Sequence, residues 1–195
     1  GDSMDNHSWL STGHIDLRDF RFKGTHFDRI ETDIEIDGLV QNFLNLEIER
    51  PEGTASGERI GIDRGNGGRT EFRGVTGNLD LGPVVRAFHA PTAERLTRYR
   101  FEHPPEFAVE GVIAGRGQTG QTDLQLAFRS DRPAATELLD RDWTFDQVTG
   151  RVAFRGGDTT VHVEGGLLGG DAILDIAVVD GIVSGNLLGQ GLDFD

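Results

Sequence analysis

Apolar and polar residues alternate along most of this chain, and glycine-rich breaks separate the alternating stretches. The clearest stretch covers residues 30–36, where isoleucine or threonine occupies the even positions and an acidic residue the odd ones. Because successive residues of a strand point to opposite faces, this pattern predicts a strand with one apolar and one polar face. About eleven such stretches predict an all-β protein. We expect a long, curved antiparallel sheet, either an open groove or a closed sandwich, with two short helical insertions.

One strand-turn-strand pattern occurs twice. It runs from Phe27 to Gly38 and again from Phe145 to Gly156, at a constant offset of 118 (145 minus 27). The apolar positions of one copy match apolar positions of the other. A repeated unit of this kind does not bury its apolar face alone. The repeat therefore predicts two related halves that share one architecture.

The repeat divides the chain into a disordered lead-in over 1–13, a first β repeat over 14–100 and a second β repeat over 101–195. Proline fits the first turn of a helix, and prolines open both predicted helical segments. The first segment covers 83–99 and the second 133–139, which the aspartate two positions before Pro133 would cap.

A one-faced sheet must cover its apolar side with helices, with another sheet, by closure, or with a hydrophobic ligand. The sequence leaves two interpretations open: an ordinary closed core packed on the two helices, or a surface for lipid. The candidate lipid- or core-facing residues come from four strands. They are Ile30, Ile34, Ile36, Leu44, Leu46, Ile48, Val148, Val152, Phe154, Leu174, Ile176 and Val178.

Composition and motifs argue against several function classes. The net charge of −14 repels phosphate backbones, so we expect no nucleic-acid partner. The chain has no cysteine, which excludes disulfides and a thiol nucleophile. The six histidines share no motif, no Gly-x-Ser-x-Gly elbow or phosphate loop occurs, and the glycine-rich segment 63–68 is typical of a plain turn. We therefore expect a non-enzymatic protein without cofactor or metal.

The order of four features over residues 14–189 resembles the repeated C-terminal modules of the AsmA-like family of bacterial envelope proteins. The first feature is the pair of strand openings Phe27-Asp28-Arg29-Ile30 and Phe145-Asp146-Gln147-Val148, and the second is the lead into a helical segment, Asn78-Leu79-Asp80-Leu81-Gly82-Pro83. The third is the run Tyr99-Arg100-Phe101, followed by Pro104-Pro105 and the strand Phe107-Ala108-Val109-Glu110-Gly111. The fourth is the closing set of hairpins from Val163-Glu164-Gly165-Gly166 to Asp171-Ala172.

The resemblance implies a periplasmic module of a longer envelope protein that is anchored in the inner membrane. Its role would be structural or lipid-shielding, in lipid transport or outer-membrane homeostasis. Its partners would be lipid acyl chains or neighbouring repeats of a longer chain. No stretch approaches the roughly 20 apolar residues of a membrane-spanning helix, so an anchor would lie outside this sequence. The alternative is a self-contained β-sandwich that serves as a binding or adhesion module without a lipid role.

Overall fold

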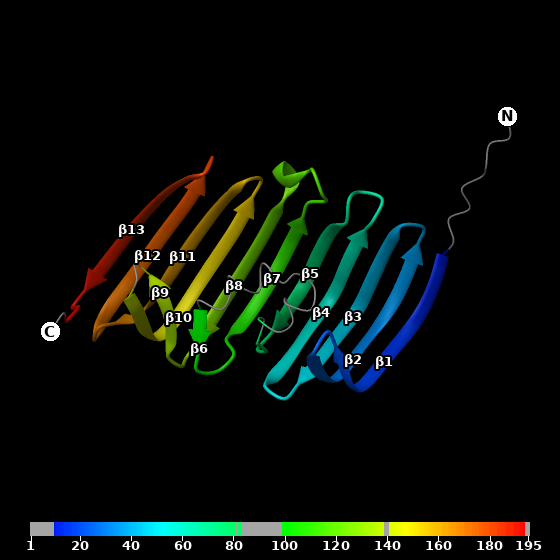
Figure 1. Cartoon of the computed structure of the whole chain (residues 1–195), viewed down its shortest axis with the longest axis horizontal. Coiled ribbons are helices and arrows are strands. Elements are labelled where there is room, and N and C mark those ends of the chain that lie inside the picture. Colours follow the sequence, from blue (N-terminus) through cyan, green and yellow to red (C-terminus); the bar gives the residue numbers. More distant parts are fainter. Residues whose placement is uncertain (1–9, 81, 83–98, 139–140, 194–195) are drawn as a thin grey trace.

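The computed structural model describes residues 10–80, 82, 99–138 and 141–193, which form an all-β structure with one short 3₁₀ helix, η1 (Thr119–Gln121). Its thirteen strands all belong to one sheet (Figure 1). The strands are β1 (Leu10–Phe22), β2 (Thr25–Asp37), β3 (Val40–Arg50), β4 (Gly53–Asp63), β5 (Arg69–Gly77), β6 (Tyr99–Phe101), β7 (Glu106–Ile113), β8 (Asp123–Ser130), β9 (Ala134–Leu138), β10 (Arg141–Arg155), β11 (Asp158–Leu167), β12 (Gly170–Val179) and β13 (Ile182–Gln190).

The main path of the sheet follows the chain almost without interruption. Its order is β1-β2-β3-β4-β5-β7-β8-β10-β11-β12-β13, and every neighbouring pair is antiparallel. Consequently β1 and β13 are the two edge strands of this path, and they lie at opposite ends of the sheet (Figure 1). This confirms the predicted antiparallel sheet. Because the described residues form a single sheet, they do not form a two-sheet sandwich.

A small flap leaves the main path in the second half. It consists of β6, β9 and the first five residues of β10, paired in that order. Ala134 of the flap and Phe145, where β10 joins the main sheet, pack with Val148, Leu167 and Ala172 into the core cluster. The flap therefore forms a second layer over this region of the sheet. The side chains of the core cluster lie between the two layers and are buried there, whereas a single layer has no such core.

A row of β-bulges crosses the first half of the sheet. The register places Asn45 of β3 opposite Glu58 of β4, and Glu58 opposite Gly74 of β5. The strands on either side, β2 and β7, lack the extra residue, so the register shifts between β2 and β3 and again between β5 and β7. Asn45 and Gly74 have φ of 51° and 59°, the left-handed conformation that bulges use. A glycine inside an alternating stretch predicts a bulge. The structure confirms this at Gly74, which belongs to a row of three such positions.

The helix predicted over 133–139 is wrong. Residues Ala134–Leu138 form strand β9, which pairs on one side with β10 and on the other with β6. The segment contains good helix formers, but so short a helix is marginal, and tertiary pairing decides its conformation. Asp131, the expected cap, instead accepts hydrogen bonds from the guanidinium of Arg129 at 3.0 Å.

The structure also differs from the boundaries predicted for the first helical segment, the lead-in and the two repeats. Most of the predicted helical segment 83–99 lies outside the described residues, and its last residue, Tyr99, begins strand β6. Strand β1 begins at Leu10, inside the stretch expected to be a disordered lead-in over 1–13. The β6 strand spans the expected boundary at residue 100, and one continuous sheet joins the two halves.

The two copies of the repeated pattern both fold as strand-turn-strand units. The first copy lies in β2 and the turn to β3, and the second lies in β10 and the turn to β11. Their leading phenylalanines, Phe27 and Phe145, are both buried, at 2% and 8% exposure. The prediction of a repeated hairpin is confirmed.

Candidate functional site

The two faces of the sheet differ sharply in chemistry. Residues that pair directly across an antiparallel ladder point to the same face, so a row of such pairs can be followed from edge to edge. One row crosses all eleven strands of the main path and contains only apolar residues and glycine. It consists of Leu17, Ile30, Ile48, Ala55, Gly77, Phe107, Phe128, Gly150, Val163, Leu174 and Leu187.

We call the side to which this row points the apolar face. The residues that pair on this side in the ladders from β3 to β13 are apolar or glycine, with a few serine, threonine or glutamine residues. Arg50 is the one charged residue among them. Most of the apolar side chains are half-buried.

The flap covers part of the apolar face. The core cluster of Phe145, Val148 and Leu167 lies on this side, and the ring of Phe128 packs against it. Phe101 of β6 meets Phe128 edge-on, with ring centres 6.2 Å apart. This contact shows how an aromatic side chain from another segment can occupy the apolar face.

Arg50 lies at the rim of the apolar face, at the end of β3. Its side chain is only 9% exposed, and its Nε donates to the Glu52 carboxylate at 2.5 Å. The guanidinium carbon lies 5.4 Å from the centre of the Phe27 ring, a cation–π distance. Its Nη1 is buried and has no hydrogen-bond partner in the described part of the chain. A buried donor without an acceptor is costly, so an oxygen atom of a ligand would be favoured there.

The opposite side, the polar face, carries a second continuous row of paired residues. Charged side chains lie toward both ends of this row, and small side chains lie in its middle. The row consists of Asp16, Glu31, Glu47, Ser56, Thr76, Ala108, Ala127, Arg151, His162, Asp175 and Asn186. The register of the sheet therefore separates a polar face from a predominantly apolar one.

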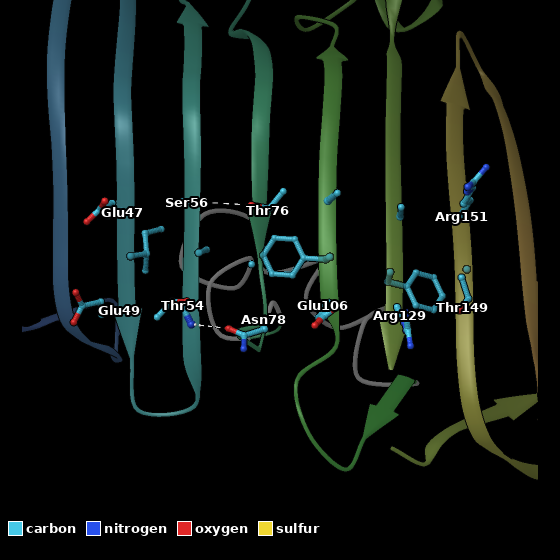
Figure 2. Close-up of a pocket in the computed structure, with 18 residues that line it drawn as sticks. Glu47, Glu49, Thr54, Ser56, Thr76, Asn78, Glu106, Arg129, Thr149 and Arg151 are labelled. Atoms are coloured by element: carbon cyan, nitrogen blue, oxygen red, sulfur yellow. Dashed lines mark hydrogen bonds between the residues drawn. The ribbon is translucent and has the colours of Figure 1, made fainter. Parts of the chain in front are cut away.

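A furrow of about 740 Å³ crosses β3, β4, β5, β7, β8 and β10 (Figure 2). Two rows of its lining residues belong to the polar face, and the lining residues between these rows belong to the apolar row. Glu47 and Glu49 line one end, and Arg129 and Arg151 the other. The Ser56 and Thr76 hydroxyls, on β4 and β5, lie 3.4 Å apart. Glu106 of β7 also lines the furrow and pairs with Arg129 in the ladder.

A second hollow of about 390 Å³ lies beside the furrow, over β10–β13, and contains His162. The hydrogen bond to Asp175 (Nδ1 to Oδ1, 2.6 Å) raises the pKa of His162, and the bond to Glu164 (Nε2 to Oε1, 2.8 Å) raises it further. His162 lies between Val161 and Val163 in the sequence, which predicts a position on the polar face, and the side chain is half-exposed there.

A similar charged cluster lies near the opposite edge. The hydrogen bond to Asp33, at 2.9 Å, raises the pKa of His14. The guanidinium groups of Arg18 and Arg29 lower the pKa of Asp16 to about 2. Among the described residues, no group of three His, Asp or Glu side chains has a geometry that could hold a metal ion.

Eleven of the twelve candidate residues from the sequence lie on the apolar face, as the ladders place them. The exception is Leu44, which pairs with Asp33 and Arg59 on the polar side. The bulge at Asn45 shifts the alternation by one residue, so Leu44 and Leu46 point to opposite faces. Asparagine tolerates positive φ better than most residues, and it is the one sequence signal for this shift.

Sequence reasoning missed three parts of these surfaces. Phe107 and Phe128 are not among the candidate residues that the sequence predicts, and they fill the centre of the apolar row. Arg50 carried no signal, because an arginine at a strand end is ordinary. The furrow arises from pairing between distant strands, which the sequence does not reveal.

Comparison of the chain with protein-family models, with curated proteins and with solved structures found no match. No helix in the described part of the chain has the length and apolarity that a membrane crossing needs.

Proposed function

We propose that this chain is a non-enzymatic, lipid-shielding module of the AsmA-like kind, which acts in the bacterial periplasm as part of a longer, inner-membrane-anchored protein. The observation that carries the proposal is the uncharged row across eleven strands. A soluble sheet with one apolar side needs a cover for that side. The flap covers one region of it in the second half.

Acyl chains fit the dimensions of this face. Adjacent strands lie about 4.8 Å apart, so a row of eleven strands extends roughly 48 Å. Each methylene group removed from water contributes about 0.8 kcal/mol. A fatty chain that lies over a few strands therefore gains several kcal/mol from contact with Phe107, Phe128 and their neighbours. The unsatisfied Nη1 of Arg50 would donate to an ester or phosphate oxygen at the rim.

Native mass spectrometry of the protein expressed in bacteria tests this function. The expected result is co-purified phospholipid on the wild type. Ile176→Glu places a carboxylate on the apolar face and should remove the lipid. Ala177→Glu places the same carboxylate one residue away, on the polar face, and should retain it. Circular dichroism establishes that both variants keep the β-sheet.

Two results would count against the lipid role. One is a wild type that carries no lipid and does not enhance the fluorescence of a hydrophobic dye. The other is loss of lipid to the same extent in both variants, which would place the lipid elsewhere.

A binding module without a lipid role is the second candidate, and the furrow favours it. The furrow has an acidic end and a basic end about 24 Å apart, which is five strand spacings. An extended peptide of about seven residues has that length, with an amine at one end and a carboxylate at the other. Calorimetry with a free-ended Ser/Gly heptapeptide, and with its acetylated, amidated form, tests this function. Binding of the free form alone, abolished by Ala127→Trp, is expected.

A further inference from the structure

The two edge strands of the main path are built differently. Strand β13 contains no charged residue, and all nine of its residues are exposed. Ile182, Val183, Leu187 and Leu188 are between 49% and 72% exposed, on both faces of the strand. Strand β1 at the other edge carries five charged or histidine side chains, which include Asp16. Charges on an edge strand prevent pairing with other chains, so β1 is protected and β13 is not.

The sequence of β13 is palindromic in residue type. It reads apolar, apolar, polar, glycine, polar, apolar, apolar over Ile182–Leu188, with Gly185 at the centre. Two such strands that run in opposite directions and cross at Gly185 would match apolar with apolar and polar with polar. Self-complementarity of this kind is what a two-fold symmetric interface requires.

Strand direction also favours pairing of like edges. The main path has eleven strands, all antiparallel to their neighbours, so β1 and β13 run in the same direction. Stacking the β13 edge of one copy on the β1 edge of another without turning it would create a parallel pair. A two-fold axis at β13 instead creates an antiparallel pair, which continues the pattern of the sheet and is slightly more stable.

From these observations we propose that two copies of this chain pair through β13, antiparallel about Gly185, into one continuous sheet. In this register Val183 faces Leu187 of the second copy on the apolar face. Ile182 faces Leu188 of the second copy on the polar face. Each contact occurs twice, so all four exposed apolar side chains are covered. The apolar faces of both copies lie on the same side, which doubles the extent of the uncharged surface. This inference is independent of the lipid role.

The net charge of the chain determines the salt concentration at which dimerisation is best measured. Each chain carries a net charge of −14, so two copies repel each other at low ionic strength. The Debye length is about 8 Å at 0.15 M salt, and the paired edge itself carries no charge. Dimerisation should therefore strengthen as salt rises to about 0.5 M.

Sedimentation or light scattering over a range of concentrations gives the first measurement. A dimer mass is expected at high concentration for the wild type. Leu187→Lys should weaken the dimer at least about tenfold, because the change occurs twice in the interface. Leu17→Lys is the matched control, since Leu17 is the other end of the same apolar row and has similar exposure. It should leave the dimer unchanged.

Cross-linking gives a second measurement that tests the register. The chain has no cysteine, so Gly185→Cys introduces a single thiol on the proposed axis. The nearest atoms to an added Cβ there are at 3.4 Å or more, so the substitution is tolerated. Opposite Cβ atoms of paired strands lie about 4.5–5.5 Å apart, close to disulfide distance. Gly13→Cys on β1, with open space around it, is the control.

Mild oxidation should give a covalent dimer for Gly185→Cys and little for Gly13→Cys. A monomer at every concentration and salt level would overturn the proposal. Equal cross-linking at both edges would overturn it as well, because it would show random collision.

Discussion

The two copies of the repeated strand, β2 and β10, keep one face and change the other. On the apolar face, Ile34 of β2 corresponds to Val152 of β10 at the 118-residue offset. On the polar face, Asp33 corresponds to Arg151. The repeat thus preserves the face that the sheet must cover and leaves the solvated face free to change its charge.

The surroundings of the two copies also differ. Strand β10 continues at its start into the flap, so Phe145 is buried in the core cluster. Strand β2 has no such flap among the described residues, and Phe27 is buried between Phe20, at 5.2 Å between ring centres, and Arg50. A similar pattern can therefore bury its leading aromatic side chain in two ways, by a second layer or by stacking with aromatic and cationic neighbours.

The largest effect should come from removing these aromatic rings. Phe145→Ala should lower the free energy of unfolding by about 3–5 kcal/mol, because it leaves a cavity in the core cluster. Phe27→Ala should cost a similar amount, since Phe27 is at least as buried. Denaturant unfolding measures both values. A cost below about 1 kcal/mol for Phe27→Ala would show that stacking on a single layer does not replace the flap.

The next effect concerns Thr32 and Gly150, which also correspond at this offset. Gly150 lies beneath the Phe128 ring, and an added Cβ would lie 2.2 Å from that ring. Gly150→Ala should therefore cost about 1–3 kcal/mol by overpacking. At the first copy, Thr32 faces Ile15 instead, and its hydroxyl donates to the Leu44 carbonyl at 3.0 Å.

A double-mutant cycle tests the cause. Phe128→Leu removes the ring, so the combined variant Gly150→Ala/Phe128→Leu should lose less stability than the sum of the two single variants. Strict additivity would show that Gly150 is needed for a reason other than space for the ring.

A smaller loss of stability should distinguish the substitution of a glycine in the bulge row of the first half from the substitution of a glycine at an ordinary strand position. Gly74 has φ of 59°, and an added Cβ would lie 2.7 Å from the Glu58 side chain. Gly74→Ala should cost about 1–2 kcal/mol, from the left-handed backbone and the displaced side chain. Gly13→Ala on β1 meets no atom of the described residues within 4 Å and should change stability by less than about 0.5 kcal/mol. Thermal unfolding of both variants measures the difference.

The alternating pattern predicted most of these strands, because burial of one face forces a period of two. It placed Ile34 and Val152 on one side of one sheet, and the glycine at 74 indicated a bulge. The face of Leu44 could not be predicted, since it depends on a bulge that an asparagine forms only in the context of its neighbours.

Strand β9 shows a second limit of the sequence. Its residues favour a helix when taken alone, and only the pairing with β6 and β10 makes them a strand. The furrow and the flap depend on the same long-range pairing. Local patterns therefore predict which residues alternate, whereas contacts distant in sequence decide which elements cover the sheet.

The smallest effect concerns the charge that differs between the two copies. Arg151 of β10 pairs directly with His162, and the corresponding residue of β2 is Asp33, which bonds His14. Arg151→Asp would make β10 resemble β2 and place a third carboxylate near His162. The pKa of His162 should then rise further above its ordinary value, whereas Asp175→Asn should lower it by removing the strongest hydrogen bond. Imidazole titration by NMR measures both shifts.

The sign of the pH dependence follows from these directions. The folded pKa of His162 lies above the unfolded value near 6.5, so the protonated side chain is favoured in the fold. Its contribution to stability is fully present below pH 6.5 and is lost as the pH rises through the raised folded value. Arg151→Asp should move that loss to higher pH and Asp175→Asn to lower pH, while the pKa of His14 stays constant as the internal control. A shift of His14 in either variant would show that the two charged clusters are coupled across the sheet, against the view that each copy sets its own polar face.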